Sequence, residues 1–123
     1  MAYQFAAVAQ FSLGVMYYPI GDPSLDTAKG NLAQALIWYR RAAEQGNIDA
    51  QVALGLAYAQ GMGVVQDYVE ADKWFNIAAS RANSADELAD IVTRHNKLAH
   101  VMTTSQITEA QKLARAWRAK PER

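Results

Sequence analysis

The 123-residue sequence has no cysteine, only two histidines and no excess of charge of either sign. The lack of cysteine excludes disulfides, thiolate nucleophiles and cysteine metal sites, and says nothing about the redox compartment. Twelve lysines and arginines balance twelve aspartates and glutamates. The chain therefore lacks the bulk positive charge with which proteins hold nucleic acid or an anionic membrane, and a general polyanion binder is disfavoured.

Long apolar runs are also missing. The longest uncharged stretch, residues 1–21, is broken by polar residues and by Pro19, and it has no basic leading region. We expect no transmembrane span and no signal peptide in this chain, which leaves a cytoplasmic location, or a periplasmic one if a signal was removed. Hydrophobic residues still make up 51% of the sequence, so a single domain of this length can bury a core.

The sequence contains an internal repeat. The Leu-Gly-x-x-Tyr motif of Leu13–Tyr17 recurs at Leu54–Tyr58, and a second motif with an aromatic pair between alanines occurs at 35–43 and again at 71–79. The two motifs lie farther apart in the first copy, so that copy contains extra residues between them. We expect these residues in a loop at 19–24, because the proline and glycine there cannot continue a helix.

Each motif has the spacing of a helix. Gly55 leaves room for a neighbouring backbone, and the aromatic residues of the second motif are expected in the core between helices, where they face small alanines. These aromatic residues are Trp38, Tyr39, Trp74 and Phe75. Asn31 and Asp67 are predicted N-caps of the second helices, and Gly46 a C-cap. Gly61 and Gly63 can adopt positive φ in the loop before Asp67.

Two further helices are predicted after residue 83. Ser84 and Glu87 have the spacing of a capping box, and Thr103 with Gln106 offers a second one. The first of these helices has an apolar stripe, and so does the second. The stripes consist of Leu88, Ile91, Val92, His95, Ala99 and Met102, and of Ile107, Ala110, Ala114 and Trp117. Neither helix carries the repeat motif, so both are expected to cap the apolar face of the last repeat.

The motifs resemble those of the tetratricopeptide class. Gly61-x-Gly63-Val64 followed by Asp67 and by the second motif is similar to the Sel-one-like repeat (SLR) family, most clearly over residues 50–82. The segment 102–111 looks like the ending of bacterial members. The resemblance implies an all-α, α-α superhelix (tetratricopeptide-like solenoid) with repeats at about 4–46 and 49–82 and capping helices at about 84–120, in one domain covering 1–123.

Catalytic chemistry finds little support in the sequence. His95 and His100 would point about 140° apart on one helix, so they cannot bind one metal ion from the same face. No nucleophile elbow is present, and the acidic residues at 86–90 are explained by the dipole at a helix N-terminus. We therefore expect no enzyme activity, no cofactor and no metal site, and interpret His95 as a packing residue.

A surface is the better candidate for function. In tetratricopeptide-like solenoids the first helices of successive repeats line a concave face, and the resemblance places six mostly apolar side chains on it: Phe11, Val15, Tyr18, Val52, Leu56 and Ala59. An apolar patch of this size needs an explanation. It can be a groove for a peptide or helix of a partner protein, a self-association surface that makes a homodimer, or a contact with the last helices.

The charges are unevenly distributed along the chain. Residues 1–80 have an acidic excess, and residues 81–123 have a basic one. This asymmetry has three interpretations. It can favour head-to-tail association, it can steer an acidic partner to the C-terminal arginines and lysine, or it can reflect only the solvated face of the last helix. The leading hypothesis is a non-catalytic protein-interaction adaptor, as the resemblance implies, and the alternative is a self-associating structural protein whose concave face is filled by a second copy.

Overall fold

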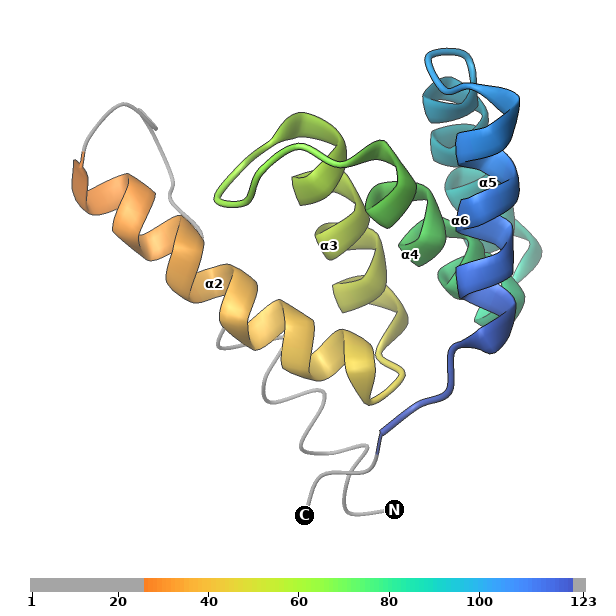
Figure 1. Cartoon of the computed structure of the whole chain (residues 1–123). Coiled ribbons are helices and arrows are strands. Elements are labelled where there is room, and N and C mark those ends of the chain that lie inside the picture. Colours follow the sequence, from red (N-terminus) through yellow and green to blue (C-terminus); the bar gives the residue numbers. More distant parts are fainter. Residues whose placement is uncertain (1–25, 121–123) are drawn as a thin grey trace.

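The computed structural model describes residues 26–120, and this part of the chain is all helical, as predicted. Helix α2 spans Asp26–Glu44, α3 spans Ile48–Gln60 and α4 spans Tyr68–Arg81, followed by α5 at Ala85–Ala99 and α6 at Thr104–Ala116. Helix α2 packs on α3, α3 packs on α4, and α4 packs on both α5 and α6 (Figure 1). This succession of packed helices is an α-α superhelix.

The N-cap predicted at Asn31 is wrong. Helix α2 begins at Asp26, so Asn31 lies inside it. The segment before Asn31 contains no proline, and Ala28 and Lys29 favour helix, although Gly30 disfavours it. The helix therefore continues through residues that form a loop in the second copy. The loop predicted at 19–24 lies outside the described residues.

Glycine ends α2 and α3 as predicted. Gly46 has φ 104° and its N–H donates to the carbonyl of Ala43, 3.1 Å away, after the end of α2. Gly61 has φ 68° and donates to the carbonyl of Ala57 at the end of α3, and Gly63 has φ 77°. Positive φ is costly for residues with a Cβ, so these positions favour glycine and fix the directions in which the chain leaves each helix.

Gly55 brings α3 and α4 close together. A Cβ at this position would lie 2.6 Å from Cε1 of Phe75 and 3.2 Å from the backbone oxygen of Ala71. The predicted core aromatics Tyr39, Trp74 and Phe75 are no more than 5% exposed, whereas Trp38 is only half-buried. Glycine opposite a large ring thus allows the interdigitation of these two helices.

The side-chain caps predicted at the start of α5 and α6 are present, but the full capping box forms only at α6. The Ser84 side chain accepts from the N–H of Glu87, while the Glu87 carboxylate accepts from Asn83 rather than from Ser84. At α6 the Thr103 side chain accepts from Gln106, and Oε1 of Gln106 accepts from the N–H of Thr103. This reciprocal pair is the capping box predicted there.

The apolar stripe predicted for α5 is partly wrong. Of the predicted residues, Ile91 and Met102 are buried, but Leu88 and Val92 are 40% and 39% exposed. The buried Leu98 was not part of the predicted stripe. Helix α5 lies along one side of α4, so only the residues that face α4 are covered. In α6 the predicted stripe holds, because Ala110 is buried and Ile107, Ala114 and Trp117 pack against the core.

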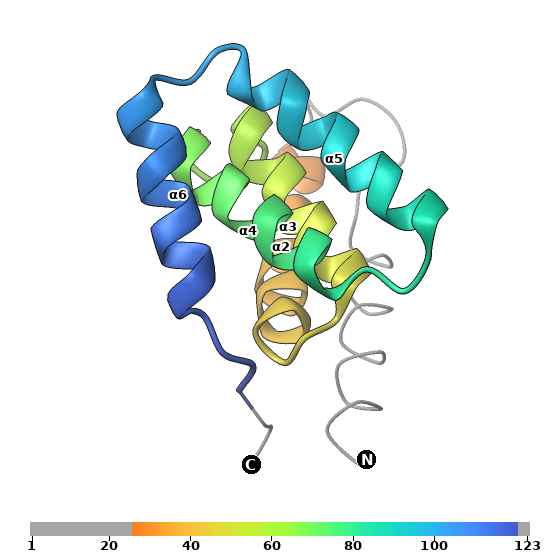
Figure 2. The same ribbon diagram turned by 90° about the vertical axis from the view of Figure 1, so that its right-hand side faces the viewer.

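The core has two clusters that meet at α4. One lies among α2, α3 and α4 around Leu54, Trp74 and Ile77, and the other joins α4 to α5 and α6 around Phe75 and Ile91. Figure 2 shows α5 and α6 joined at one end and spreading apart, with α4 between them. The two C-terminal helices therefore cover the face of α4 that the repeats leave exposed.

Candidate functional site

The structure describes the part of the predicted concave surface that belongs to the second repeat. Val52, Leu56 and Ala59 lie on α3, are half-buried and pack against the cluster shared by α4, α5 and α6. Phe11, Val15 and Tyr18 lie outside the described residues. Part of the predicted surface is thus used for contact inside the chain, which was one of the three explanations of its apolar character.

An open pocket of about 300 Å³ remains beside these residues. Val52, Leu56 and Ile91 contribute apolar side chains to it from α3 and α5, and Ala59 does not line it. The pocket therefore joins one helix of the second repeat to the first capping helix. Val52 and Leu56 are half-buried there, whereas Ile91 is buried.

Three carboxylates also line this pocket: Asp49, Glu87 and Asp90. Asp90 forms an ion pair with Arg94, with 3.1 Å between Oδ2 and Nε, and one oxygen of Glu87 accepts from the backbone of Asn83. No lysine or arginine is among the described residues that line the pocket. An apolar surface bordered by acidic groups favours a ligand that has both apolar and basic groups.

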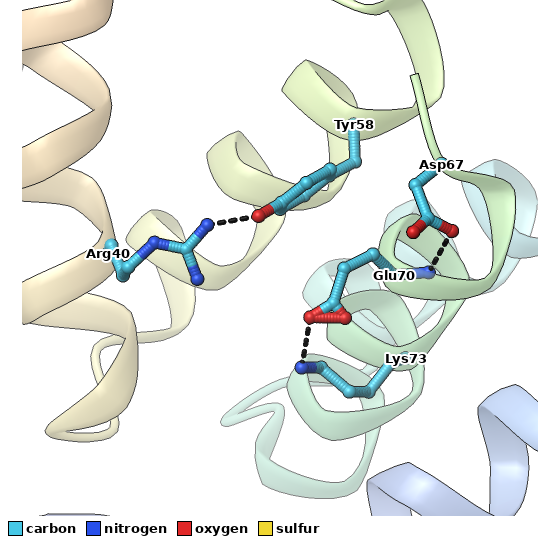
Figure 3. Close-up of polar contacts among 5 residues, drawn as sticks. All are labelled: Arg40, Tyr58, Asp67, Glu70 and Lys73. Carbon is cyan, nitrogen blue, oxygen red and sulfur yellow. Dashed lines mark hydrogen bonds and ion pairs between the residues drawn. The ribbon is translucent and has the colours of Figure 1, made fainter. Parts of the chain in front are cut away.

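A polar contact joins α2 to α3, and further polar contacts stabilise the start of α4. The Arg40 guanidinium of α2 donates to the Tyr58 hydroxyl of α3 (Figure 3). The guanidinium carbon lies 5.6 Å from the centre of the tyrosine ring. Asp67 accepts from the N–H of Glu70, and Glu70 pairs with Lys73 in the first turns of α4. The tyrosine of the Leu-Gly-x-x-Tyr motif is therefore a link between repeats.

A buried carboxylate links α4 to α5. Asp72 is fully buried, with Oδ1 2.5 Å from Nδ1 of His95 and Oδ2 3.3 Å from the Asn76 amide nitrogen. Burial raises the pKa of Asp72 above its ordinary value, although the hydrogen bond and charge of His95 and the Asn76 amide oppose that shift. His95 thus belongs to the packing interface, as interpreted from its place in the apolar stripe.

Sequence reasoning missed Asp72 as the partner of His95. The available signal was its place directly after Ala71 and one turn from Phe75 and Asn76, on the buried side of α4. Within residues 26–120 no three histidine, aspartate or glutamate side chains gather to form a metal-binding group. The helices in the same part of the chain include none with both the length and the apolar character to cross a membrane.

Comparison with known proteins accounts for the repeated helical pairs. Two adjoining segments, residues 7–47 and 48–83, match the family model of the Sel1 repeat. The chain belongs to the Sel1 repeat family. This is the Sel-one-like family that the sequence motifs resemble, and Sel1 repeats are generally protein-interaction modules that are not catalytic.

A solved Sel1-type structure is similar over most of the chain. The crystal structure of c5321, a protective antigen present in uropathogenic Escherichia coli strains and displaying an SLR fold, matches 92% of this chain with a TM-score of 0.59 and 31% sequence identity. The match covers 30% of c5321. The Sel1 chain thus corresponds to about a third of that longer protein.

Proposed function

We propose that this Sel1 chain is a non-catalytic adaptor that holds an extended or helical segment of a partner protein on its concave face. The family resemblance places Val52, Leu56 and Ala59 on this face, together with Phe11, Val15 and Tyr18, which lie outside the described residues. The observation that carries the proposal is the open pocket beside Val52 and Leu56, whose apolar side chains are bordered by carboxylates. Helical-repeat proteins use such concave surfaces to bind extended segments of other chains.

The pocket also suggests the chemistry of the partner segment. An apolar side chain can cover Val52 and Leu56, and a lysine or arginine next to it can approach Asp49 and Asp90, both of which are exposed. Because the carboxylates are open to solvent, their attraction for a basic segment should weaken as salt is added. We therefore expect a partner segment with alternating apolar and basic residues.

Affinity capture from a lysate of the source organism, followed by mass spectrometry, tests the proposal. The baits are the natural chain, a Val52→Glu/Leu56→Glu variant, and a control in which glutamate replaces Val65 and Val101, which are 88% and 61% exposed. Circular dichroism checks that each bait stays helical. The proposal expects prey that the natural chain and the control retain and the pocket variant loses. Identical prey on all three baits would contradict it.

A second pair of variants avoids half-buried positions. Asp49→Lys/Asp90→Lys reverses two exposed pocket charges, and Asp86→Lys/Glu109→Lys reverses two exposed charges outside the pocket. Loss of the same prey from the first pair alone, with elution at raised salt, supports a basic partner segment. If the Asp49→Lys/Asp90→Lys bait retains the prey as well as the Asp86→Lys/Glu109→Lys bait does, the pocket carboxylates take no part in binding.

Self-association is the second candidate function. The pocket on α3 and α5 carries carboxylates, whereas the C-terminal region carries several arginines, and such opposite charges favour head-to-tail contact between two copies. Light scattering at several protein concentrations separates the candidates. A mass that rises with concentration, and falls for Asp49→Lys/Asp90→Lys, would favour a structural protein whose concave face is filled by a second copy.

A further inference from the structure

A second open pocket, of about 640 Å³, lies between α4, α6 and the segment that follows α6. Its described lining includes three arginines, one from each of these elements: Arg81, Arg115 and Arg118. No carboxylate is among the described lining residues, although the chain as a whole is neutral. Positive charge is therefore concentrated locally, away from the carboxylates beside α3.

The neighbours of Arg81 hold its guanidinium in position. The guanidinium carbon lies 5.7 Å from the centre of the Trp117 ring, and a Cβ at Gly46 would lie 2.6 Å from Nη2. The Trp117 ring in turn packs edge-on against buried Trp74, with 6.1 Å between ring centres. A cation held between a ring and a glycine loses little freedom when it binds an anion.

Arg118 is also positioned by the fold. Its Nη1 donates to the carbonyls of Arg115 and Trp117, at 2.9 and 2.7 Å. The end of this segment is tied to α2, because the N–H of Lys120 donates to the carbonyl of Glu44 across 2.7 Å. The pocket wall formed by the C-terminal segment is thus attached at both ends.

The arginines retain unused hydrogen-bonding capacity. Each guanidinium has five N–H donors, and none of the three arginines forms an ion pair with a described carboxylate. Gln111 and Asn76 add amide groups to the same wall. The lining is rich in donors, so a ligand that fits it must supply acceptors with negative charge, and the planar guanidinium suits carboxylates in particular.

We propose that this arginine pocket binds an acidic peptide segment of a partner protein, with aspartate or glutamate carboxylates on Arg81, Arg115 and Arg118. The pocket is open to solvent, which suits a chain that keeps part of its surface in water. Three localised cations on a neutral chain suit a short acidic segment better than the long uniform charge of a nucleic acid or membrane. The site differs from the concave-face pocket in position and in sign.

Fluorescence anisotropy with a labelled, acetylated hexaglutamate peptide tests the proposal. The natural chain is compared with an Arg81→Gln/Arg115→Gln/Arg118→Gln variant. A control variant loses the same charge at exposed Arg41, Lys97 and Lys112, outside the pocket. We expect the pocket variant to bind about tenfold more weakly or worse, and the control to stay within about threefold of the natural chain. Hexaglutamine serves as the uncharged probe and should not bind.

Nuclear magnetic resonance locates the peptide independently of the variants. The indole N–H signal of Trp117 should shift as hexaglutamate is added, whereas that of Trp38 on α2 should not. Circular dichroism verifies that all variants remain helical.

Three results would overturn the proposal. The first is no hexaglutamate binding by the natural chain at low salt, and the second is an equal loss in the pocket and control variants. The third is retention of an oligonucleotide or anionic vesicle through these arginines while hexaglutamate is ignored. In the first case the arginines only stabilise the ends of α4 and α6 through the helix dipoles. None of these results depends on whether the concave face binds a partner.

Discussion

Replacing Gly55 by alanine tests the packing of α3 on α4 most directly. The added methyl group would lie 2.6 and 2.9 Å from two carbons of the Phe75 ring and 3.2 Å from the backbone oxygen of Ala71. Phe75 is 1% exposed, so the ring has no open space to move into, and the Ala71 oxygen belongs to the α4 backbone. We therefore expect α3 and α4 to be forced apart.

Two opposing effects set the size of the change. Alanine favours the helix over glycine by about 1 kcal/mol at an interior position. Forcing an extra methyl group into a packed core costs about 1–3 kcal/mol, and the upper end applies because both contacts are with groups that cannot swing away. The net expectation for Gly55→Ala is a loss of about 2 kcal/mol in the free energy of unfolding.

Urea unfolding followed by circular dichroism measures this loss. The matched control is the same substitution in a Phe75→Leu background, where a smaller side chain makes room for the methyl group. There the cost of Gly55→Ala should fall by at least about 1 kcal/mol, since the two sites are in contact. If Gly55→Ala alone stabilises the chain by about the amount of its helix propensity, the close approach of the two helices is refuted.

Two further predictions concern α5 and α6. A fragment ending at Ala82 should aggregate or unfold without cooperativity, because it lacks the residues of α5 and α6 in the second cluster; a soluble, cooperative fragment 1–82 would show that these helices are dispensable. The second prediction compares Asp72 with Asp72→Asn, both in a His95→Gln background. The unfolding free energy of the Asp72 protein, relative to that of the Asp72→Asn variant, should rise as pH falls from neutral toward 3.8, the ordinary pKa of aspartate. Because burial raises the pKa of Asp72 in the folded state, that state takes up the proton at higher pH than the unfolded state. A difference between the two proteins that stays constant, or that falls as pH falls, would contradict the raised pKa.

Local sequence signals predicted the helical pairs and much of their capping. The motifs around Leu54 and Trp74 have helical spacing, and the positive φ of Gly61 and the cap at Asp67 follow from the chemistry of single residues. The sequence also predicted that a neighbouring backbone can approach at Gly55, but not that Phe75 and Ala71 of α4 lie there. The helical spacing and the caps depend on neighbours within a few positions of the chain.

The start of α2 was decided differently. A repeat comparison places a cap at Asn31, but the helix begins at Asp26, because no proline lies between these residues and a single glycine there does not end the helix. Aligning the two repeats assigns the cap of the second copy to the equivalent position of the first copy. The observed boundary of a helix depends instead on the residues that are present locally.

Only the tertiary structure decided which residues of the C-terminal helices matter. The α5 sequence offers more apolar positions than α4 can cover, so the line of contact buries Ile91 and Leu98 and leaves Val92 exposed. The same contact brings His95 to Asp72, and the contact of α6 with α4 gathers Arg81 and Arg118 around one pocket. Periodicity in the sequence determines that a helix has an apolar face, but the neighbouring helix determines which part of that face is buried and which charged groups meet.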